Sequence, residues 1–372
     1  MKKLISLLII LSALLTLVSC GGYDPVPSTE EESRTVMTLS IDGKSYEIKY
    51  ELYRAMFLTY KNSVDGGDAS VWSGTDREKY IAEVHELITR RVTDIYAALH
   101  HADTIGINPY SDKVNKEISE YVKTSVEGGV FAGETLLGYE SYDAYLQALA
   151  ELGMNYSVQE LIFRYAIIID LITEHYVGVI KDDKLDSTPT GGALEYTREE
   201  VEEFYYSDDA VRYMSAFVQS QYEGAYDRAA ALRERMLAKE GDDNAVAIEI
   251  ISNSISAASD VMNGTLIGRY SLDEENYGDI TSAAFSTAVG RVSEIVEITV
   301  GDEIGYFILY PIDKTAEHFD ECYAEIAEAY VEHEIGRLLF DTQSALIESA
   351  VATDVLKGLD YSSISYPTVN LD

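Results

Sequence analysis

Cysteine is scarce in this chain, because Cys20 and Cys322 are the only two among 372 residues. Cys20 closes an apolar N-terminal run, which leaves Cys322 as the one thiol of the remaining sequence. No internal disulfide can therefore hold the fold, and stability has to come from a buried core. With 47% hydrophobic residues the chain can build such a core, and its length favours two domains over one.

Basic residues are also few, since 28 lysines and arginines stand against 65 aspartates and glutamates, a formal net charge of -37. Nucleic acid is excluded as a partner, because phosphate binding depends on clustered basic charge. An acidic surface keeps a protein soluble and attracts basic clients or cations.

The motifs of common catalytic and metal sites are missing. There is no His-Glu-x-x-His pair, no Gly-x-Ser-x-Gly elbow and no phosphate-binding loop, which argues against metalloprotease, hydrolase and nucleotide-binding functions. The pairs His100-His101 and His333-Glu334 lack a second ligand at metal-binding spacing. The sequence therefore predicts no metal and no cofactor.

The N-terminus reads as a secretory signal. Two lysines precede an apolar run that is too short for a comfortable membrane span and that ends in the sequence LVSC at Cys20. This junction resembles a bacterial lipobox, in which Cys20 is lipidated and becomes the first mature residue. We expect a lipoprotein signal peptide over residues 1–19. The composition rich in Pro, Ser and Glu predicts a flexible tether over residues 20–34.

The next segment reads as a β-hairpin followed by helices. Strand-like runs flank Asp42-Gly43, a pair typical of two-residue hairpin turns. Apolar residues then recur at spacings of three and four, which indicates helices with one buried face. These helices are expected over residues 50–61, 76–102, 111–126, 141–152 and 157–180.

Tyrosine is abundant in this helical part, and the chain has 29 tyrosines in all. Tyrosine offers apolar area with a polar tip, so these side chains suit an adaptable groove as well as a core. Both interpretations stay open, with packing the default, for Tyr139, Tyr142, Tyr145, Tyr156 and Tyr165.

The pattern changes after residues 187–192, a segment of Gly, Pro and Thr that is a candidate joint. Thr197 and Glu200 form a capping box that begins a short helix. A strand, two helices, a Gly-containing loop and a final hairpin follow, and helical periodicity returns over residues 316–355. A small α/β unit is thus inserted between two helical segments.

Four short motifs of this insert resemble the second half of a parvulin-type peptidyl-prolyl isomerase domain. In chain order they are IGRY from Ile267, AAF from Ala283, GRVS from Gly290 and GYFIL from Gly305. Together with the lipobox, the segment boundaries are similar to those of PrsA/SurA-type extracytoplasmic foldases. The resemblance implies an α+β fold in which a mainly helical chaperone lobe carries a parvulin-like α/β domain.

The same resemblance implies the domain limits. Residues 35–195 and 315–372 would build the helical chaperone lobe from N- and C-terminal segments. Residues 196–314 would form the parvulin-like domain with its leading helix.

An isomerase of this kind has to lower a barrier of about 18 to 20 kcal/mol to rotation about a peptide bond. No nucleophile is required, because an apolar pocket that binds the twisted amide more tightly than the planar one accelerates the rotation. The family's centre usually contains two facing histidines and a Cys or Asp. Ser215 and Phe307 stand at the histidine positions, and Asp260 and Ser259 are the candidates for the third.

Compared with the family, this chain has therefore lost most of the polar residues of the centre but keeps more of the apolar residues that line the pocket. Ser215, Asp260 and Ser293 are the candidate catalytic residues. The candidate peptide-binding residues are Ile267, Tyr277, Ile280, Phe285 and Phe307. Core packing is the alternative for these apolar residues, and for Phe285 it is the favoured interpretation.

These observations predict a lipid-anchored foldase on the extracytoplasmic face of the cell membrane. It would bind unfolded or proline-containing polypeptides and carry a degenerate or weak peptidyl-prolyl isomerase domain. One alternative is a fully active isomerase whose pocket uses hydroxyls in place of histidines. Another is a solute-binding lipoprotein, which the long helical runs disfavour. The sequence leaves a homodimer open.

Overall fold

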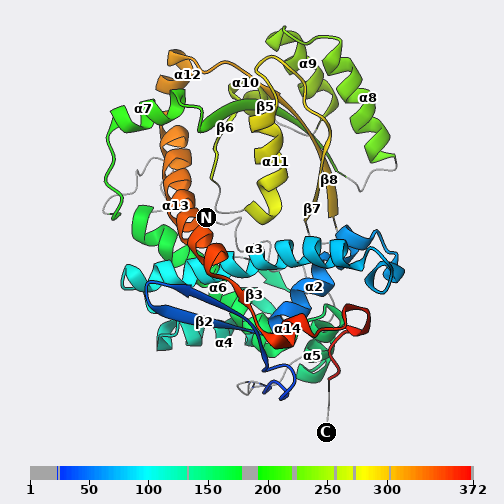
Figure 1. Cartoon of the computed structure of the whole chain (residues 1–372). Coiled ribbons are helices and arrows are strands. Elements are labelled where there is room, and N and C mark those ends of the chain that lie inside the picture. Colours follow the sequence, from blue (N-terminus) through cyan, green and yellow to red (C-terminus); the bar gives the residue numbers. More distant parts are fainter. Residues whose placement is uncertain are drawn as a thin grey trace. The chain divides into compact units, whose positions relative to one another are not determined.

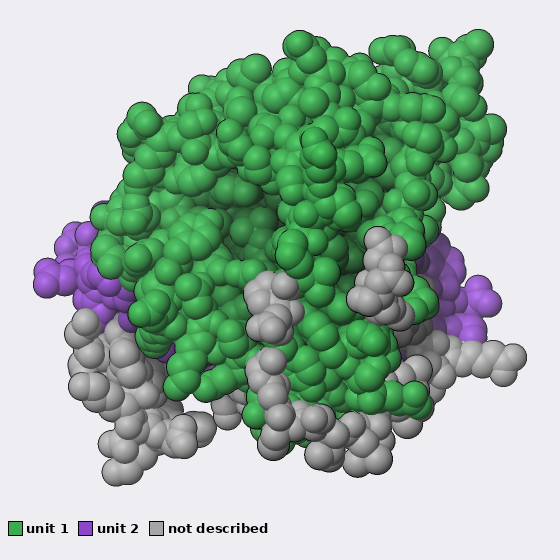
Figure 2. All heavy atoms as spheres, turned by 90° about the horizontal axis from the view of Figure 1, so that it is seen from below, with its two compact units in different colours: residues 1–172, 339–372 green, residues 173–338 purple. Residues whose placement is uncertain are grey.

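The computed structural model describes residue 23 and residues 26–131, 134–177, 192–219, 224–254, 258–270, 274–300 and 303–369. The chain divides into two compact units, which Figure 2 shows in different colours. Unit 1 is Met1–Ile172 with Leu339–Asp372, and unit 2 is Thr173–Leu338. Both units combine helices with small antiparallel sheets, so the expected α+β class is confirmed.

Unit 1 is mainly helical. Its elements are β1 (Thr35–Ile41), β2 (Lys44–Lys49), α2 (Tyr50–Asp65), the 3-10 helix η2 (Ala69–Trp72), α3 (Arg77–Thr104), α4 (Asp112–Glu127), β3 (Gly129–Phe131), β4 (Glu134–Leu136), α5 (Tyr142–Glu151) and α6 (Tyr156–Val177). After the insert come β9 (Val351–Ala352), α14 (Asp354–Lys357) and the 3-10 helix η3 (Tyr361–Ser363). The long helices α6 and α13 (Tyr323–Ser349) each cross a boundary between the units.

The expected N-terminal hairpin is confirmed. Asp42 and Gly43 both have positive φ, 49° and 76°, as a two-residue turn between β1 and β2 requires. β2 lies near α3 (Figure 1), and the ring centroids of Tyr46 in β2 and Tyr96 in α3 are 5.2 Å apart. The predicted helices are present as well. For example, α4 and α5 begin after the N-caps Ser111 and Ser141, whose side chains accept backbone hydrogen bonds.

Segments from both ends of the chain complete unit 1. The short strand β9 pairs antiparallel with β1, where Met37 lies opposite Ala352 and Thr38 opposite Val351. Thr353 adds a backbone hydrogen bond from its N–H to the Val36 carbonyl, at 2.9 Å. The core shares apolar residues from the two segments, and the later segment contributes Leu346, Leu356 and Tyr361.

Part of the segment expected to be a tether is ordered on unit 1. The Glu32 carboxylate accepts a hydrogen bond from the Arg54 guanidinium at 2.7 Å, and both side chains are nearly buried. The Ser28 hydroxyl lies 2.9 Å from that of Ser157, and the N–H of Tyr50 donates to the Arg34 carbonyl at 2.8 Å. Residues 28–34 therefore pack on unit 1, although their composition suggested a flexible tether.

Unit 2 is built around a four-stranded antiparallel sheet. Its elements are α7 (Arg198–Tyr206), β5 (Ala210–Gln219), α8 (Ala225–Leu237), α9 (Asp243–Asn253), α10 (Ala258–Asn263), β6 (Thr265–Gly268), α11 (Glu274–Ser286), β7 (Val296–Val300), β8 (Glu303–Pro311) and α12 (Ala316–Glu321). The strand order is β6-β5-β8-β7. The capping box of Thr197 and Glu200 at the start of α7 is confirmed.

Unit 2 extends beyond the insert expected over residues 196–314. Phe319 of α12 and Ile326 of α13 are buried with Val201 and Tyr205 of α7. This apolar cluster ties the residues after the sheet to the helix before it. The first part of α13 therefore belongs to the same compact unit as the sheet.

Candidate functional site

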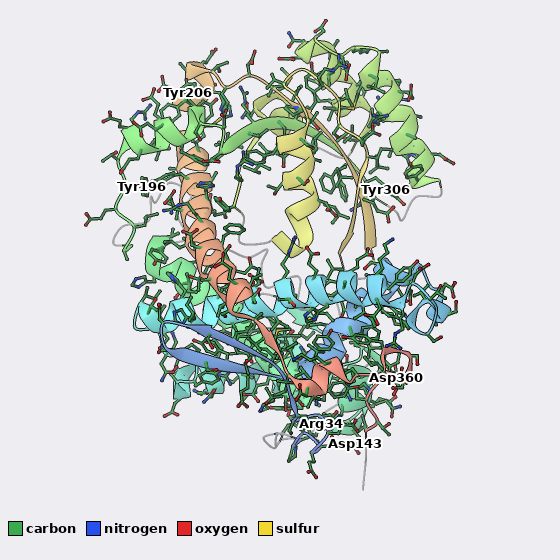
Figure 3. All side chains as sticks on the ribbon, viewed as in Figure 1. Arg34, Asp143, Tyr196, Tyr206, Tyr306 and Asp360 are labelled. Atoms are coloured by element: carbon green, nitrogen blue, oxygen red, sulfur yellow. The ribbon has the colours of Figure 1, made fainter. Side chains whose placement is uncertain are left out.

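The two faces of the unit 2 sheet bury different clusters. On one face, Met214, Ala216 and Val218 of β5 are buried with apolar residues of α8 and α9. Tyr306 of β8 lies toward α8, with its ring centroid 5.5 Å from that of Tyr226 (Figure 3). Because side chains alternate along a strand, residues 213, 215 and 217 lie on the opposite face, which α11 covers.

The two positions assigned to the missing histidines share the face that α11 covers. Ser215 of β5 lies opposite Leu309 of β8, and Phe217 lies opposite Phe307. Ser215 and Phe307 are therefore diagonal neighbours on adjacent strands, a spacing within reach of large side chains. The rings of Phe217 and Phe307 stack with centroids 4.5 Å apart and an interplanar angle of 27°.

Apolar side chains surround these two positions. Ile280 of α11 is buried, with 4% of its surface exposed, and it packs with Leu309, which is fully buried. Ile267 of β6 and Phe307 are partly buried in the same cluster. The structure thus brings together four of the predicted residues, Ser215, Ile267, Ile280 and Phe307, on one side of the sheet.

Phe285 lies apart from that cluster. Its ring faces the guanidinium group of Arg269, with 4.6 Å between the guanidinium carbon and the ring centroid. Arg269 is held in turn by Asp209, at 2.8 Å from Nε to the carboxylate. Tyr277 also belongs to α11, but its side chain lies outside the described residues.

The hydroxyl of Ser293 is engaged by backbone groups. It donates to the Glu294 carbonyl at 2.6 Å and accepts from the N–H of Leu309 at 2.9 Å. Asp260 belongs to α10, and its side chain lies outside the described residues. The neighbouring Val261 is buried with Met214 on the opposite face of the sheet, so α10 packs away from Ser215.

Buried histidines in unit 2 lie outside the α11 face and serve packing. His333 of α13 contacts the rings of Phe204 and Tyr270, at centroid distances of 4.9 and 5.2 Å. Burial, the largest cause, lowers its pKa. A Cβ on Gly268 would lie 2.7 Å from the Cβ of His333, so the motif glycine permits this close approach. Within the described residues, no group of three His, Cys, Asp or Glu side chains is placed to hold a metal.

A second candidate site lies in unit 1, and sequence reasoning missed it. A pocket of about 400 Å³ opens between α4, β3 and α6, a volume typical of small-ligand sites. Its aromatic wall consists of Tyr121, Phe131 and Phe163. The ring centroid of Tyr121 lies 3.9 Å from that of Phe163 and 4.8 Å from that of Phe131. The only local signal was an aromatic residue in the Gly-rich run GGVFAG after α4.

The tyrosines considered as groove residues are mostly part of the core. Tyr145, Tyr156 and Tyr165 are buried, with 3%, 6% and 9% of their surfaces exposed. Tyr165 also donates a hydrogen bond to Asp94 at 2.9 Å. Packing is therefore the correct interpretation for these three, while the rings of Tyr139 and Tyr142 lie against the ring of Tyr145.

The expected lipidation site, Cys20, lies outside the described residues. Among the helices that the structure does describe, none combines the length and the apolar character needed to cross a membrane. Cys322, between α12 and α13, is a partly exposed free thiol whose pKa is raised, chiefly by burial.

Comparison with known proteins gives few matches. No protein-family model and no curated protein matches the chain. Among solved structures, foldase protein PrsA from Streptococcus pneumoniae matches with 13% identity and a TM-score of 0.23, over 83% of this chain and 92% of that one. Foldase protein PrsA from Lactococcus lactis matches with 12% identity and a TM-score of 0.24, over 90% and 100% of the two chains. Both scores are low, so the proposals below are built on this chain's own residues.

Proposed function

We propose that this chain is a membrane-anchored extracytoplasmic foldase. Unit 1 binds unfolded segments of other polypeptides. Unit 2 is a parvulin-like domain that holds proline-containing segments and has weak or no isomerase activity. Cys20 carries the lipid that attaches the protein to the membrane.

The observation that carries this proposal is the interruption of one compact unit by another. Unit 1 is assembled from Met1–Ile172 and Leu339–Asp372, with unit 2 inserted between them. This is the arrangement that the resemblance to PrsA/SurA-type foldases implies. The four motifs of the insert lie in the sheet, in the helix that covers it, or next to them. IGRY spans the end of β6, AAF lies in the last turn of α11, GRVS precedes β7, and GYFIL lies in β8.

Weak catalysis follows from the chemistry of the α11 face. Ser215 and Phe307 replace two groups that can exchange protons and donate hydrogen bonds to a twisted amide. Phe307 offers a wall stacked on Phe217, which suits a proline ring. Without groups that bind the twisted amide more tightly than the planar one, binding is uniform and gives no rate acceleration.

The first prediction concerns the two activities of the mature chain without its lipid, residues 21–372. In a refolding assay limited by proline isomerisation, an equimolar amount is expected to change the slow rate by less than about twofold. The same preparation is expected to suppress aggregation of a chemically unfolded client, measured by light scattering.

Each assay can contradict a separate part of the proposal. Strong acceleration of the slow phase, abolished by Phe307→Ala, would establish the alternative of an active isomerase without histidines. Unchanged light scattering would remove the chaperone function. Membrane attachment is tested separately, because Cys20→Ala should move the protein from the membrane fraction to the soluble extracytoplasmic fraction.

A further inference from the structure

The pocket of unit 1 has an aromatic wall and charged residues at its mouth. Tyr121 and Phe163 are buried, and Ala166 and Ile167 of α6 add aliphatic surface. At about 400 Å³ the pocket has room for one or two large side chains rather than a folded domain. Its apolar lining therefore selects a large apolar side chain.

Charged residues line the mouth from two helices. Lys113, Lys116, Glu117 and Glu120 come from α4, and Asp170 comes from α6. Lys116 is already paired with Glu120, at 3.6 Å between Nζ and the carboxylate. Three carboxylates against two ammonium groups leave an excess of negative charge, in a chain whose net charge is -37. Both the mouth and the field of the whole chain favour a cationic partner.

The short strand β3 favours a polypeptide over a small molecule as the ligand of this pocket. Phe131, in the pocket wall, is the last residue of β3, and the adjacent Val130 is 69% exposed. In the described part of the chain β3 pairs only with β4, so its other edge has no strand neighbour. An extended peptide can hydrogen-bond to such an edge while one of its side chains enters the pocket.

We propose that the pocket between α4, β3 and α6 binds an extended peptide segment in which an aromatic residue is flanked by basic residues. The aromatic side chain packs on Tyr121, Phe131 and Phe163, and a flanking cation faces the carboxylate of Glu117. This inference rests on the proposed chaperone function of unit 1 and specifies the class of client segment that it recognises.

The test uses fluorescence anisotropy with fluorescein-labelled peptides and the mature chain, residues 21–372. GSRFRSG is expected to bind at least about tenfold more tightly than GSRSRSG, which lacks the aromatic side chain, and than GSEFESG, which reverses the flanking charge. Raising the salt concentration should weaken binding of GSRFRSG, because exposed charges are screened. Equal binding of the three peptides would overturn the proposal.

Two variants localise the binding. Ala166→Trp fills the pocket and is expected to weaken GSRFRSG binding by about tenfold or more, whereas Ala82→Trp, at an exposed position of α3, should leave it unchanged. Glu117→Gln, at the mouth, leaves the fold intact and is expected to weaken GSRFRSG several-fold, but not the uncharged GSSFSSG. Equal affinities for Ala166→Trp and Ala82→Trp, or an unchanged affinity for Glu117→Gln, would overturn the assignment.

Failure here is distinguishable from failure of the proposed function. If the mature chain suppresses client aggregation but GSRFRSG binding is unaffected by Ala166→Trp, the chaperone function stands and this pocket is not its client site. If the chain does not suppress aggregation at all, the proposed function itself fails.

Discussion

Replacing Asp65 with alanine is expected to lower the free energy of unfolding of unit 1 by about 3 to 5 kcal/mol, because it removes the acceptor of a buried charged network. The Asp65 side chain is fully buried at the end of α2. It accepts hydrogen bonds from the Trp72 indole at 2.7 Å, the Lys61 ammonium at 2.7 Å and the N–H of Gly67 at 2.8 Å. Burial raises the pKa of Asp65, but these three hydrogen bonds and the charge of Lys61 together outweigh burial and lower the pKa overall.

Loss of this carboxylate affects more than one contact. Trp72 is 2% exposed, and its indole N–H would be left without its acceptor, which alone costs about 1 to 3 kcal/mol. The indole also packs on Phe57, with ring centroids 5.0 Å apart, and stacks on Tyr361 from the C-terminal segment. A displaced Trp72 therefore weakens the joint between the two segments of unit 1.

The measurement is urea unfolding followed by tryptophan fluorescence, which reports this region directly because Trp72 is the only tryptophan. Asp68→Ala is the matched control. Asp68 is exposed and caps a single short turn by accepting hydrogen bonds from Ser70, including one from its N–H at 3.0 Å, so its loss should cost about 1 kcal/mol or less. Similar destabilisation by the two variants would show that the buried network contributes little.

Acidification is expected to destabilise unit 2 through His318. This side chain is 7% exposed, and its Nδ1 lies 3.0 Å from the hydroxyl of Tyr205. Burial, with a smaller contribution from the charge of Arg212, lowers the pKa of His318 from 6.5 to about 4. Between these two values the unfolded chain binds a proton that the folded chain does not.

The direction of the pH effect follows from that difference. The contribution of His318 to stability is complete above about pH 6.5 and is lost as the pH falls toward 4, and its full size is at most about 3 kcal/mol. His333 and His85 change stability in the same direction, because burial lowers the pKa of each.

The test compares chemical unfolding of the mature chain and of His318→Gln, by far-ultraviolet circular dichroism, from about pH 7.5 to pH 4. The variant is expected to lose less stability than the parent chain over this interval, because glutamine does not titrate. Parallel pH profiles for the two proteins would exclude His318 as a source of the acid sensitivity.

Local sequence signals predicted the elements that local physics determines. The Asp42-Gly43 turn was correct because both residues tolerate the left-handed backbone that a two-residue hairpin needs. The helix α3 was correct because Val84, Ile88 and Val92 repeat at helical spacing and are all fully buried. In each case the signal lies within a few residues of the structure it specifies.

Elements fixed by distant contacts were missed. α11 contains Gly278 in its interior, which costs about 1 kcal/mol relative to alanine and reads as a turn. The helix is stabilised by burial of Ile280 and Ala284 on the sheet, which no local pattern reports. β9 is only two residues long, and its partner β1 lies more than 300 residues earlier in the chain.

Some features of the candidate sites could likewise be predicted from the sequence, and others could not. The register of β5 and β8 places Ser215 and Phe307 on one face, as motif order suggested, because strands preserve alternation. Phe285 and Ser293 belong to the motifs AAF and GRVS, but the ring of Phe285 faces Arg269 and the hydroxyl of Ser293 bonds to backbone groups. The pocket of unit 1 could not be predicted, because Tyr121 and Phe163 have the same helical spacing whether they line a pocket or fill a core.

The pairing of β1 with β9 also sets the order in which the two units can fold. A chain that emerges N-terminus first exposes β1, α2 and α3 long before residues 351–363 exist to cover them. Unit 2 holds all four strands of its sheet within residues 210–311, so it can reach its final form while the earlier lobe still lacks its last strand. A released chain truncated after residue 340, which keeps all of unit 2, should therefore contain a protease-resistant insert beside an N-terminal segment that is still cleavable.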